Sequence, residues 1–285
     1  MDTENVYLNG KIIDASTAAV AITDSSFLYG IGLFETMRAV NGRVFRLDDH
    51  LARLNTSAAK LGIHRADDKE AISAAIDRLM QANELTSARL RLSLSNGPLA
   101  ADGRPSGNLL ITAAEYVPYP KEYYEKGVRV ILTDYRQNPK DPYCGHKTTC
   151  YGPRLMALRD AHAKLAAEAL WFTTENTLAE GCVSNVFVVK DGALYTPPLT
   201  TPVLPGIARQ TVLELANELK LTASEKTLRI DDLLAAEEVF LTNVIMQVLP
   251  VTSIEAHTVG DGKLGPVTGK LMTAYQSRLS SDAAG

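Results

Sequence analysis

"LAEGCVSNVFVVKDGALYTPPLTTPVLPGIAR", residues 178–209, holds more unusual features than the packing of a core requires. Glu180 stands at a glycine-marked turn before a predicted apolar strand at 184–190. A hairpin turned at Asp191-Gly192 follows, and a proline-rich loop leads into a helix that begins after Gly206. The first N–H groups of a helix can bind an anion such as a phosphate. The stretch therefore predicts an α/β fold with a candidate anion site at the start of that helix.

Turn residues and periodic apolar positions continue along the whole chain without an internal repeat. The predicted elements of the first half are hairpins at 6–14 and 34–47, helices at 50–63 and 69–83, and strands at 88–95 and 108–116. Those of the second half are a strand at 128–134, a helix at 152–167, strands at 169–174 and 184–190, and a helix at 206–221. The two prolines of 117–127 make it the predicted linker between a smaller N-terminal α/β domain, 1–116, and a larger C-terminal one, 128–285. We therefore expect a two-domain α/β (α+β) protein.

Composition narrows the class of protein. The chain has 285 residues, 46% hydrophobic and 22% charged, which suits a soluble globular protein with two modest cores. A net charge of -4 without a lysine or arginine cluster argues against nucleic acid and anionic membrane as partners. The longest apolar runs are far shorter than the roughly 20 residues of a spanning helix, and the N-terminus lacks the pattern of a signal peptide. Three cysteines without a C-x-x-C pair, Cys144, Cys150 and Cys182, indicate a cytoplasmic protein without a metal site.

A second unusual stretch, "GHKTTCYGPR" at 145–154, contains Lys147. Taken alone, Lys147 is most simply an exposed lysine, because most lysines are. Glu180 could likewise be an exposed loop residue, and Arg53 of "HLARL" a solvated residue on an amphipathic helix. Neighbouring His50 is expected to serve as a structural hydrogen-bonding group, and Cys150 as a small buried hydrophobe.

Five motifs in this order resemble one family, the class IV aminotransferases or fold-type IV pyridoxal-phosphate enzymes. The motifs are "YGIGLFETMRAVNGRVFRLDDHLARL", the lysine of "HKTTCYG", "LAEGCVSNVF", "DGALYTPPL...VLPGIAR" and "EEVFLTN...VLPV". This family includes branched-chain aminotransferases, D-amino-acid aminotransferases and aminodeoxychorismate lyases, and the resemblance covers nearly the whole chain. It implies a two-domain fold of the D-amino-acid aminotransferase type, pyridoxal 5'-phosphate bound by the larger C-terminal domain, and a homodimer.

The resemblance also implies catalytic roles. Lys147 would form a Schiff base with the cofactor aldehyde, and its released amine would move the Cα proton of the substrate. Glu180 would accept a hydrogen bond from the protonated pyridine nitrogen, which keeps the ring an electron acceptor. The remaining expected cofactor contacts are Arg53 with the N–H groups of Ile207 and Ala208 at the phosphate, and Tyr151.

The substrate pocket implied by the resemblance draws on both halves of the chain. Its expected residues are Tyr29, Phe34, Thr36, Arg89, Arg91, Val244 and Ile245. Arg89 and Arg91 would share one face of a strand and suit an anionic substrate, or form an exposed charged face. Phe34 could equally be an ordinary core residue.

Transamination and lyase chemistry begin with the same proton removal at Cα, so the pocket decides between them. "DGALYTPPLT...LPGIAR" and "GKLGPVT" resemble the branched-chain branch, whereas 244–246 and the short spacing from Lys147 to Tyr151 depart from it. The arginine–x–histidine pair of the D-amino-acid branch is absent, and Thr36 and "LTNVIMQVLPV" look lyase-like. We expect an aminotransferase that moves an amino group between a small amino acid or amine and a 2-oxo acid. The alternatives are an aminodeoxychorismate lyase, which releases 4-aminobenzoate and pyruvate, and a catalytically silent binding protein.

Overall fold

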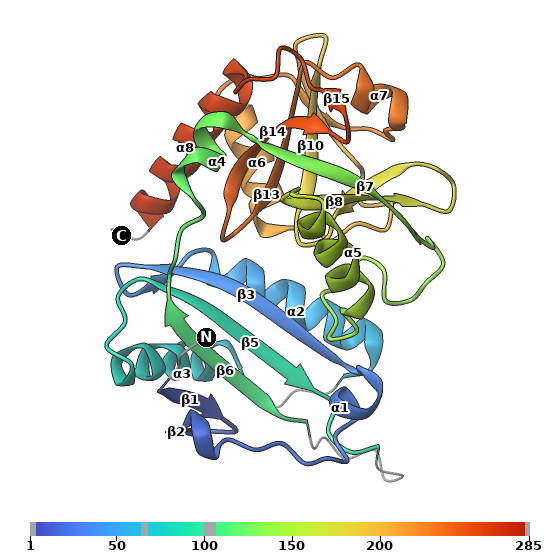
Figure 1. Ribbon diagram of the computed structural model, residues 1–285. Coiled ribbons are helices and arrows are strands. Elements are labelled where there is room, and N and C mark those ends of the chain that lie inside the picture. Colours follow the sequence, from blue (N-terminus) through green and yellow to red (C-terminus); the bar gives the residue numbers. More distant parts are fainter. Residues whose placement is uncertain (1–3, 64–67, 100–106, 283–285) are drawn as a thin grey trace. The chain divides into compact units, whose positions relative to one another are not determined.

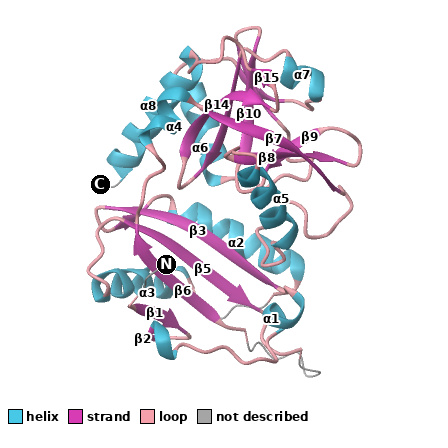
Figure 2. Ribbon diagram, in the orientation of Figure 1, coloured by secondary structure: helices cyan, strands magenta, loops and turns pink. Residues whose placement is uncertain are grey.

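The computed structural model describes residues 4–63, 68–99 and 107–282. Contacts within the chain divide it into two units. Unit 1 comprises Met1–Val117, His146–Cys150 and Leu279–Gly285, and unit 2 comprises Pro118–Gly145 and Tyr151–Arg278. Each unit has its own sheet, as Figures 1 and 2 show.

The sheet of unit 1 is antiparallel, with the order β2-β1-β6-β5-β3-β4. Its strands are β1 (Asn5–Leu8), β2 (Lys11–Asp14), β3 (Gly32–Val40), β4 (Arg43–Val44), β5 (Ala88–Ser95) and β6 (Leu109–Glu115). Both predicted hairpins are confirmed, β1–β2 with its turn at Asn9-Gly10 and β3–β4 with its turn at Asn41-Gly42. All four turn residues have positive φ, which a tight two-residue hairpin turn requires and which glycine adopts without steric cost.

Helices α2 (Leu47–Leu61) and α3 (Lys69–Ala82) cover one face of this sheet (Figure 1). Shorter turns of helix, η1 (Ala15–Thr17) and α1 (Ser25–Tyr29), precede β3. Side chains alternate along a strand, so the odd-numbered residues of β3 from Leu33 to Ala39 face the helices. Phe34 and Thr36 therefore lie on the opposite face. This alternation decides which residues of β3 support the core and which remain available to a site.

The sheet of unit 2 is mixed, with the order β12-β11-β10-β13-β14-β7-β8-β9, and β15 pairs with β14. Its strands are β7 (Val128–Gln137), β8 (Glu168–Thr173), β9 (Leu178–Gly181), β10 (Asn185–Lys190), β11 (Ala193–Thr196), β12 (Ala223–Glu225), β13 (Glu238–Asn243), β14 (Gln247–Ile254) and β15 (His257–Thr258). The helices of the second half are α4 (Lys121–Lys126), α5 (Gly152–Ala163), α6 (Ile207–Glu218), α7 (Ile230–Leu234) and α8 (Pro266–Asp282). Strand β7 pairs in parallel with both β14 and β8.

The central strands of unit 2 are buried on both faces. Val186 and Val188 of β10 belong to one apolar cluster, whereas Phe187 points the other way and stacks on Phe240 of β13 with ring centroids 4.9 Å apart. A strand covered on both sides reads as a continuous apolar run, which explains "VFVV" at 186–189. Among the described residues no helix is long and apolar enough to cross a bilayer.

Three local expectations differ from the structure. Glu180 lies within strand β9, which pairs with β8, and the glycine taken as a turn marker is the last residue of that strand. The expected linker 117–127 contains helix α4. Helix α5 ends at Ala163 rather than near 167, because Leu165 has a left-handed backbone with φ 57.

We expect Leu241→Ala to destabilise the protein by about 2–5 kcal/mol, since it empties a fully buried site in the sheet of unit 2. Leu165→Ala is the matched control, because Leu165 is 90% exposed and its loss should change the free energy of unfolding by less than about 0.5 kcal/mol. Urea unfolding of both variants measures the difference. Equal midpoints would contradict the position assigned to Leu241.

Candidate active site

Lys147 lies beside the first residues of β3 in unit 1. The backbone N–H of Phe34 donates to the Lys147 carbonyl at 2.9 Å, and Thr149 donates to the Gly32 carbonyl at 2.9 Å. This antiparallel pairing, with Leu33 opposite Thr148, places Lys147 across from Phe34. Residues directly opposite share a face, and the Lys147 Nζ indeed lies 4.4 Å from the centre of the Phe34 ring.

Phe34 also contacts a second cation. The guanidinium carbon of Arg91 lies 3.8 Å from the ring centre, and Arg91 Nε donates to Ser93 Oγ at 3.2 Å. In the β3–β5 register Thr36 is directly opposite Arg91. Phe34, Thr36, Arg91 and Lys147 therefore share one face of the sheet of unit 1. Two cationic groups beside one aromatic ring suit an anionic substrate group.

The other expected pocket residues are placed differently. Arg89 shares the strand face of Arg91 but is exposed, and Tyr29 ends helix α1 with 61% exposure. Val244 and Ile245 belong to unit 2, where they are buried in the turn between β13 and β14, and Asn243 Oδ1 accepts from the backbone of Ile245 at 2.9 Å.

Cys150 is exposed, so its expected role as a buried hydrophobe is wrong. It follows Thr149, whose Oγ1 donates to the Gly30 carbonyl at 2.9 Å and links this segment to the end of α1. A Cβ on Gly30 would come within 3.3 Å of the Cys150 Cβ. The segment thus packs against the end of α1, and the Cys150 thiol remains at the surface.

Glu35 is the centre of a buried ion cluster on the face of β3 that packs against helices α2 and α3. His50 Nδ1 lies 2.8 Å from Glu35 Oε2, and Arg53 contacts both carboxylate oxygens, at 2.8 Å from Nε and 2.5 Å from Nη2. Burial opposes the charge, but Arg53 and His50 outweigh it and lower the pKa of Glu35 to about 2. Burial also lowers the pKa of His50, so the neutral ring donates from Nδ1. Arg53 is therefore held in a fixed orientation by Glu35 and is not a solvated arginine.

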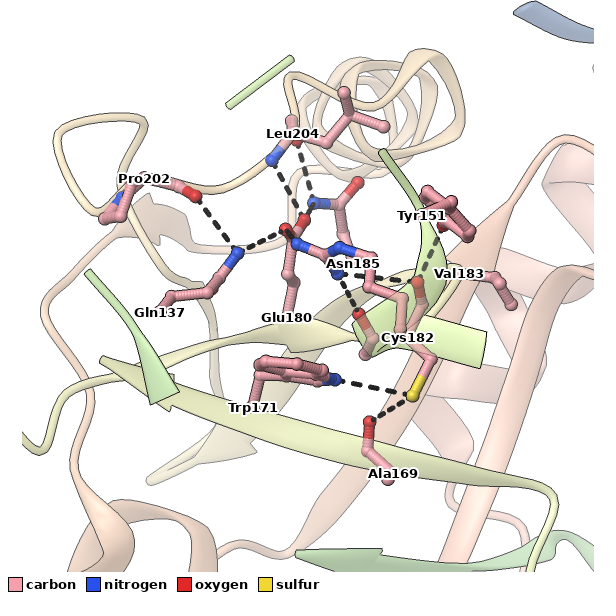
Figure 3. A network of polar contacts seen from close by, with 12 residues as sticks. Gln137, Tyr151, Ala169, Trp171, Glu180, Cys182, Val183, Asn185, Pro202 and Leu204 are labelled. Carbon is pink, nitrogen blue, oxygen red and sulfur yellow. Dashed lines mark hydrogen bonds and ion pairs between the residues drawn. The ribbon is translucent and has the colours of Figure 1, made fainter. Parts of the chain in front are cut away.

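Glu180 is the centre of a polar network in unit 2, which Figure 3 shows from close by. Its Oε1 accepts from Gln137 Nε2 at 3.0 Å and from Arg154 Nη2 at 2.5 Å. Its Oε2 accepts from the Leu204 backbone N–H at 2.9 Å, with Asn185 Nδ2 at 3.5 Å. Because a buried carboxylate is costly without partners, these donors stabilise Glu180 and fix its orientation.

Tyr151 is bound to the same network at the start of α5. Its hydroxyl donates to the Cys182 carbonyl at 2.7 Å, and burial raises its pKa, so it remains a neutral donor. Glu168 lies nearby and accepts from the Val183 backbone at 2.7 Å and from the Ser184 hydroxyl. Burial raises the pKa of Glu168 to about 7.

The start of α6 is built next to Glu180. Leu204, which donates to Glu180, is two residues before Gly206, the residue that caps α6. Asn185 Nδ2 donates to the Leu204 carbonyl at 2.9 Å, and a Cβ on Gly206 would come within 2.0 Å of Asn185 Oδ1. A larger residue at 206 would require Asn185 to shift, and glycine has no side chain to cap the first N–H groups of α6. A buried carboxylate and an uncapped helix start within one unit fit a cofactor that has both a basic ring nitrogen and a phosphate.

The expected cofactor residues are thus divided between the units. Lys147 and Arg53 belong to unit 1, and Glu180, Tyr151, Ile207 and Ala208 belong to unit 2. Sequence reasoning missed Gln137, Arg154 and Glu168. Arg154 could have been found, because it lies in the first turn of the predicted helix 152–167, three residues after the expected cofactor residue Tyr151. Within the described ranges no group of three or more histidine, cysteine or acidic side chains could hold a metal.

Comparison with known proteins gives consistent matches over the whole length. A family model described as amino-transferase class IV matches residues 32–254. The chain is 33% identical to a D-alanine aminotransferase of Bacillus licheniformis over 98% of both proteins. It is also 33% identical to a putative branched-chain-amino-acid aminotransferase of Methanocaldococcus jannaschii over 95% of both. An aminodeoxychorismate lyase of Bacillus subtilis is 29% identical over 97% of this chain and 95% of its own length.

Solved structures of related enzymes agree with these matches. The branched-chain amino acid aminotransferase of Escherichia coli superimposes with a TM-score of 0.91, at 28% identity over 97% of this chain and 94% of that one. A further branched-chain amino acid aminotransferase, solved with pyridoxamine 5'-phosphate, superimposes with a TM-score of 0.93. It is 27% identical, and the match covers 99% of this chain and 95% of that one. The expected mixed α/β fold of this enzyme type is confirmed.

We expect Glu35→Gln to lower stability by on the order of 3 kcal/mol at neutral pH, because Arg53 and His50 lose a buried carboxylate. The folded protein lowers the pKa of Glu35 from 4.5 to about 2, so this stabilisation is present above pH 4.5 and is lost as the pH falls toward 2. The difference between wild type and variant in urea unfolding should therefore shrink over that range. Glu115→Gln, at an exposed strand end, is the control. A difference that does not change with pH would contradict the assignment.

Proposed function

Because this chain belongs to the class IV aminotransferase family, a family of pyridoxal-phosphate-dependent enzymes, we propose that it moves an amino group between a small amino acid or amine and a 2-oxo acid. The family resemblance of the sequence is confirmed, and so is pyridoxal phosphate as the cofactor, since solved relatives hold its pyridoxamine form and an adduct. The observation that carries the proposed reaction is the position of Lys147 on the Phe34 ring, on the same sheet face as Arg91.

We propose that Lys147 holds the cofactor covalently and, once released, moves the proton at the substrate Cα. The backbone of Lys147 is paired with that of Phe34, and an amine held in this way can be aimed at a reacting carbon, which a mobile surface lysine cannot. Bound pyridoxal phosphate supplies an electron acceptor for the broken Cα bond. Glu180 is the partner of the ring nitrogen, and Arg53, Ile207 and Ala208 hold the phosphate. Arg91, stacked on Phe34, is the candidate partner of a substrate carboxylate.

A lyase reaction is the second candidate, because Thr36 shares the face of Arg91 and lies directly opposite it in the β3–β5 register. A hydroxyl there could hydrogen-bond a carboxylate or pass a proton. The relatives include both reaction types at similar identity. Amino transfer is preferred because it needs only a lysine, a ring-nitrogen partner and a carboxylate partner. The family assignment and the presence of both Lys147 and Glu180 leave the silent binding protein without support.

The first test is the absorbance of the protein with pyridoxal phosphate, before and after adding L-amino acids, D-amino acids and simple amines. We expect the band of the lysine-linked cofactor to give way to that of its pyridoxamine form with one donor class, and a 2-oxo acid to restore it. Lys147→Ala should abolish the band, whereas Lys140→Ala, on an exposed lysine, should keep it. Pyruvate release from aminodeoxychorismate, with no donor converting the band, would favour the lyase instead. A band that persists in Lys147→Ala would overturn the role of Lys147.

We also propose a cytoplasmic homodimer. Cys144, Cys150 and Cys182 are free thiols, as expected in a reducing compartment. Unit 1 exposes large apolar side chains close together in the chain, at 78% for Ile22, 74% for Phe27 and 49% for Leu28. Monomers rarely expose such a group, and a second copy of the chain would cover it.

Sedimentation at micromolar concentration should give twice the chain mass of 30.9 kDa. Phe27→Glu should weaken the dimer by at least tenfold, because it places a charge in an apolar contact. Leu165→Glu, at a position 90% exposed on unit 2, should leave the mass unchanged. A wild-type monomer that still turns over substrate would contradict the dimer.

A further inference from the structure

Arg154 makes a forked contact at the end of strand β9. Its Nη2 lies 2.5 Å from Glu180 Oε1, and its Nη1 donates to the Gly181 carbonyl at 2.9 Å, with the Cys182 carbonyl at 3.4 Å. The guanidinium carbon also lies 5.5 Å from the centre of the Trp171 ring. One planar group thus holds the Glu180 side chain and the backbone that follows it.

The other donors to Glu180 do not duplicate this contact. Gln137 and the Leu204 backbone are neutral donors, each with one bond to the carboxylate. Arg154 is charged: burial lowers its pKa, but the charge and hydrogen bond of Glu180, together with Tyr151 and Cys182, outweigh burial and raise the pKa above its usual value. It therefore supplies the compensating charge that a buried carboxylate needs, as well as a fixed direction.

A second buried acid, Glu168, lies near Arg154 and is its other possible carboxylate partner. The contacts of Glu168 come from the Val183 backbone and the Ser184 hydroxyl, whereas the carboxylate contact of Arg154, from Nη2, is with Glu180. On Glu180, Oε1 receives two close donors, whereas Oε2 receives one at 2.9 Å and one at 3.5 Å. The fork therefore leaves Oε2 as the oxygen with more remaining capacity to accept a proton donor.

We propose that Arg154 is a positioning residue of the cofactor site: it holds Glu180 by Oε1 so that Oε2 meets the ring nitrogen of pyridoxal phosphate. This inference rests on the proposed function, in which Glu180 binds that nitrogen. Arg154 acts only through Glu180. Its loss should therefore weaken cofactor binding when Glu180 is present and have little effect when Glu180 has already been replaced.

The test is a double-mutant cycle on cofactor affinity with Arg154→Met and Glu180→Gln. Trp171 is the only tryptophan of the chain and lies next to Arg154, so its fluorescence reports binding of pyridoxal phosphate to the apoprotein without an activity assay. We expect each single variant to weaken binding at least tenfold, and the double variant to match Glu180→Gln within about twofold. Losses that multiply in the double variant, or an unchanged affinity in a folded Arg154→Met, overturn the proposal.

Two further variants test whether the effect of Arg154 on cofactor affinity comes from its geometry, from its charge or from a loss of folding. Arg154→Lys keeps the charge but has no planar fork, so it should remain at least threefold weaker than the wild type. It also provides the comparison if Arg154→Met does not fold, and wild-type affinity in Arg154→Lys would overturn the positioning role. Arg159→Met, at an exposed arginine of the same helix, should bind as the wild type does.

The same binding measurements distinguish a failure of the proposed function from a failure of this inference. A folded wild-type protein that binds no pyridoxal phosphate, by fluorescence or absorbance, would overturn the function and this inference together. Binding that Lys147→Ala abolishes and Arg154→Met leaves unchanged would overturn the inference alone.

Discussion

The buried Glu180 carboxylate needs hydrogen-bond donors and a positive charge around it, and the candidate site of unit 2 is arranged to supply them. A carboxylate removed from water needs charge and hydrogen bonds, and here they come from a strand, a helix and a loop: Gln137 of β7, Arg154 of α5 and the Leu204 backbone before α6. The same loop brings Gly206 to the start of α6, against Asn185. The Glu180 carboxylate and the uncapped start of α6 are therefore held in place by the same loop.

In unit 1 the alternation of side chains along β3 has the corresponding effect. Glu35 points to the helices and fixes His50 and Arg53, whereas Phe34 points the other way and contacts Lys147 and Arg91. One strand thus supports a buried ion cluster on one side and contacts the amine of Lys147 and the guanidinium of Arg91 on the other. A shift of the β3 register by one residue would exchange the two sets.

Several features could be predicted from the sequence because their causes lie within a few residues. The Asn-Gly turns need positive φ at adjacent positions, and the alternation of 88–95 appears in β5 with the same bounds. The family, the fold type and the cofactor could also be predicted, because five motifs occurred in one order. The strand character of Glu180 was missed because β9 is short and its glycine resembles a turn signal. The exposure of Cys150 was missed because it depends on tertiary contacts of its segment, such as that of Thr149 with Gly30, which no local pattern records.

By itself the sequence determined the turns, most strands and helices, the family and the residue types able to perform the chemistry, because these depend on neighbours in the chain or on ordered motifs. Only the tertiary structure decided which side chains compensate one another. Arg154 and Glu180 are 26 residues apart, and Gln137 and Glu180 are 43 apart. Their pairing depends on where β7, α5 and β9 meet after folding, and burial then makes each contact necessary. A sequence pattern indicates that a carboxylate is present, but the surrounding donors that make its burial tolerable are a property of the packed fold.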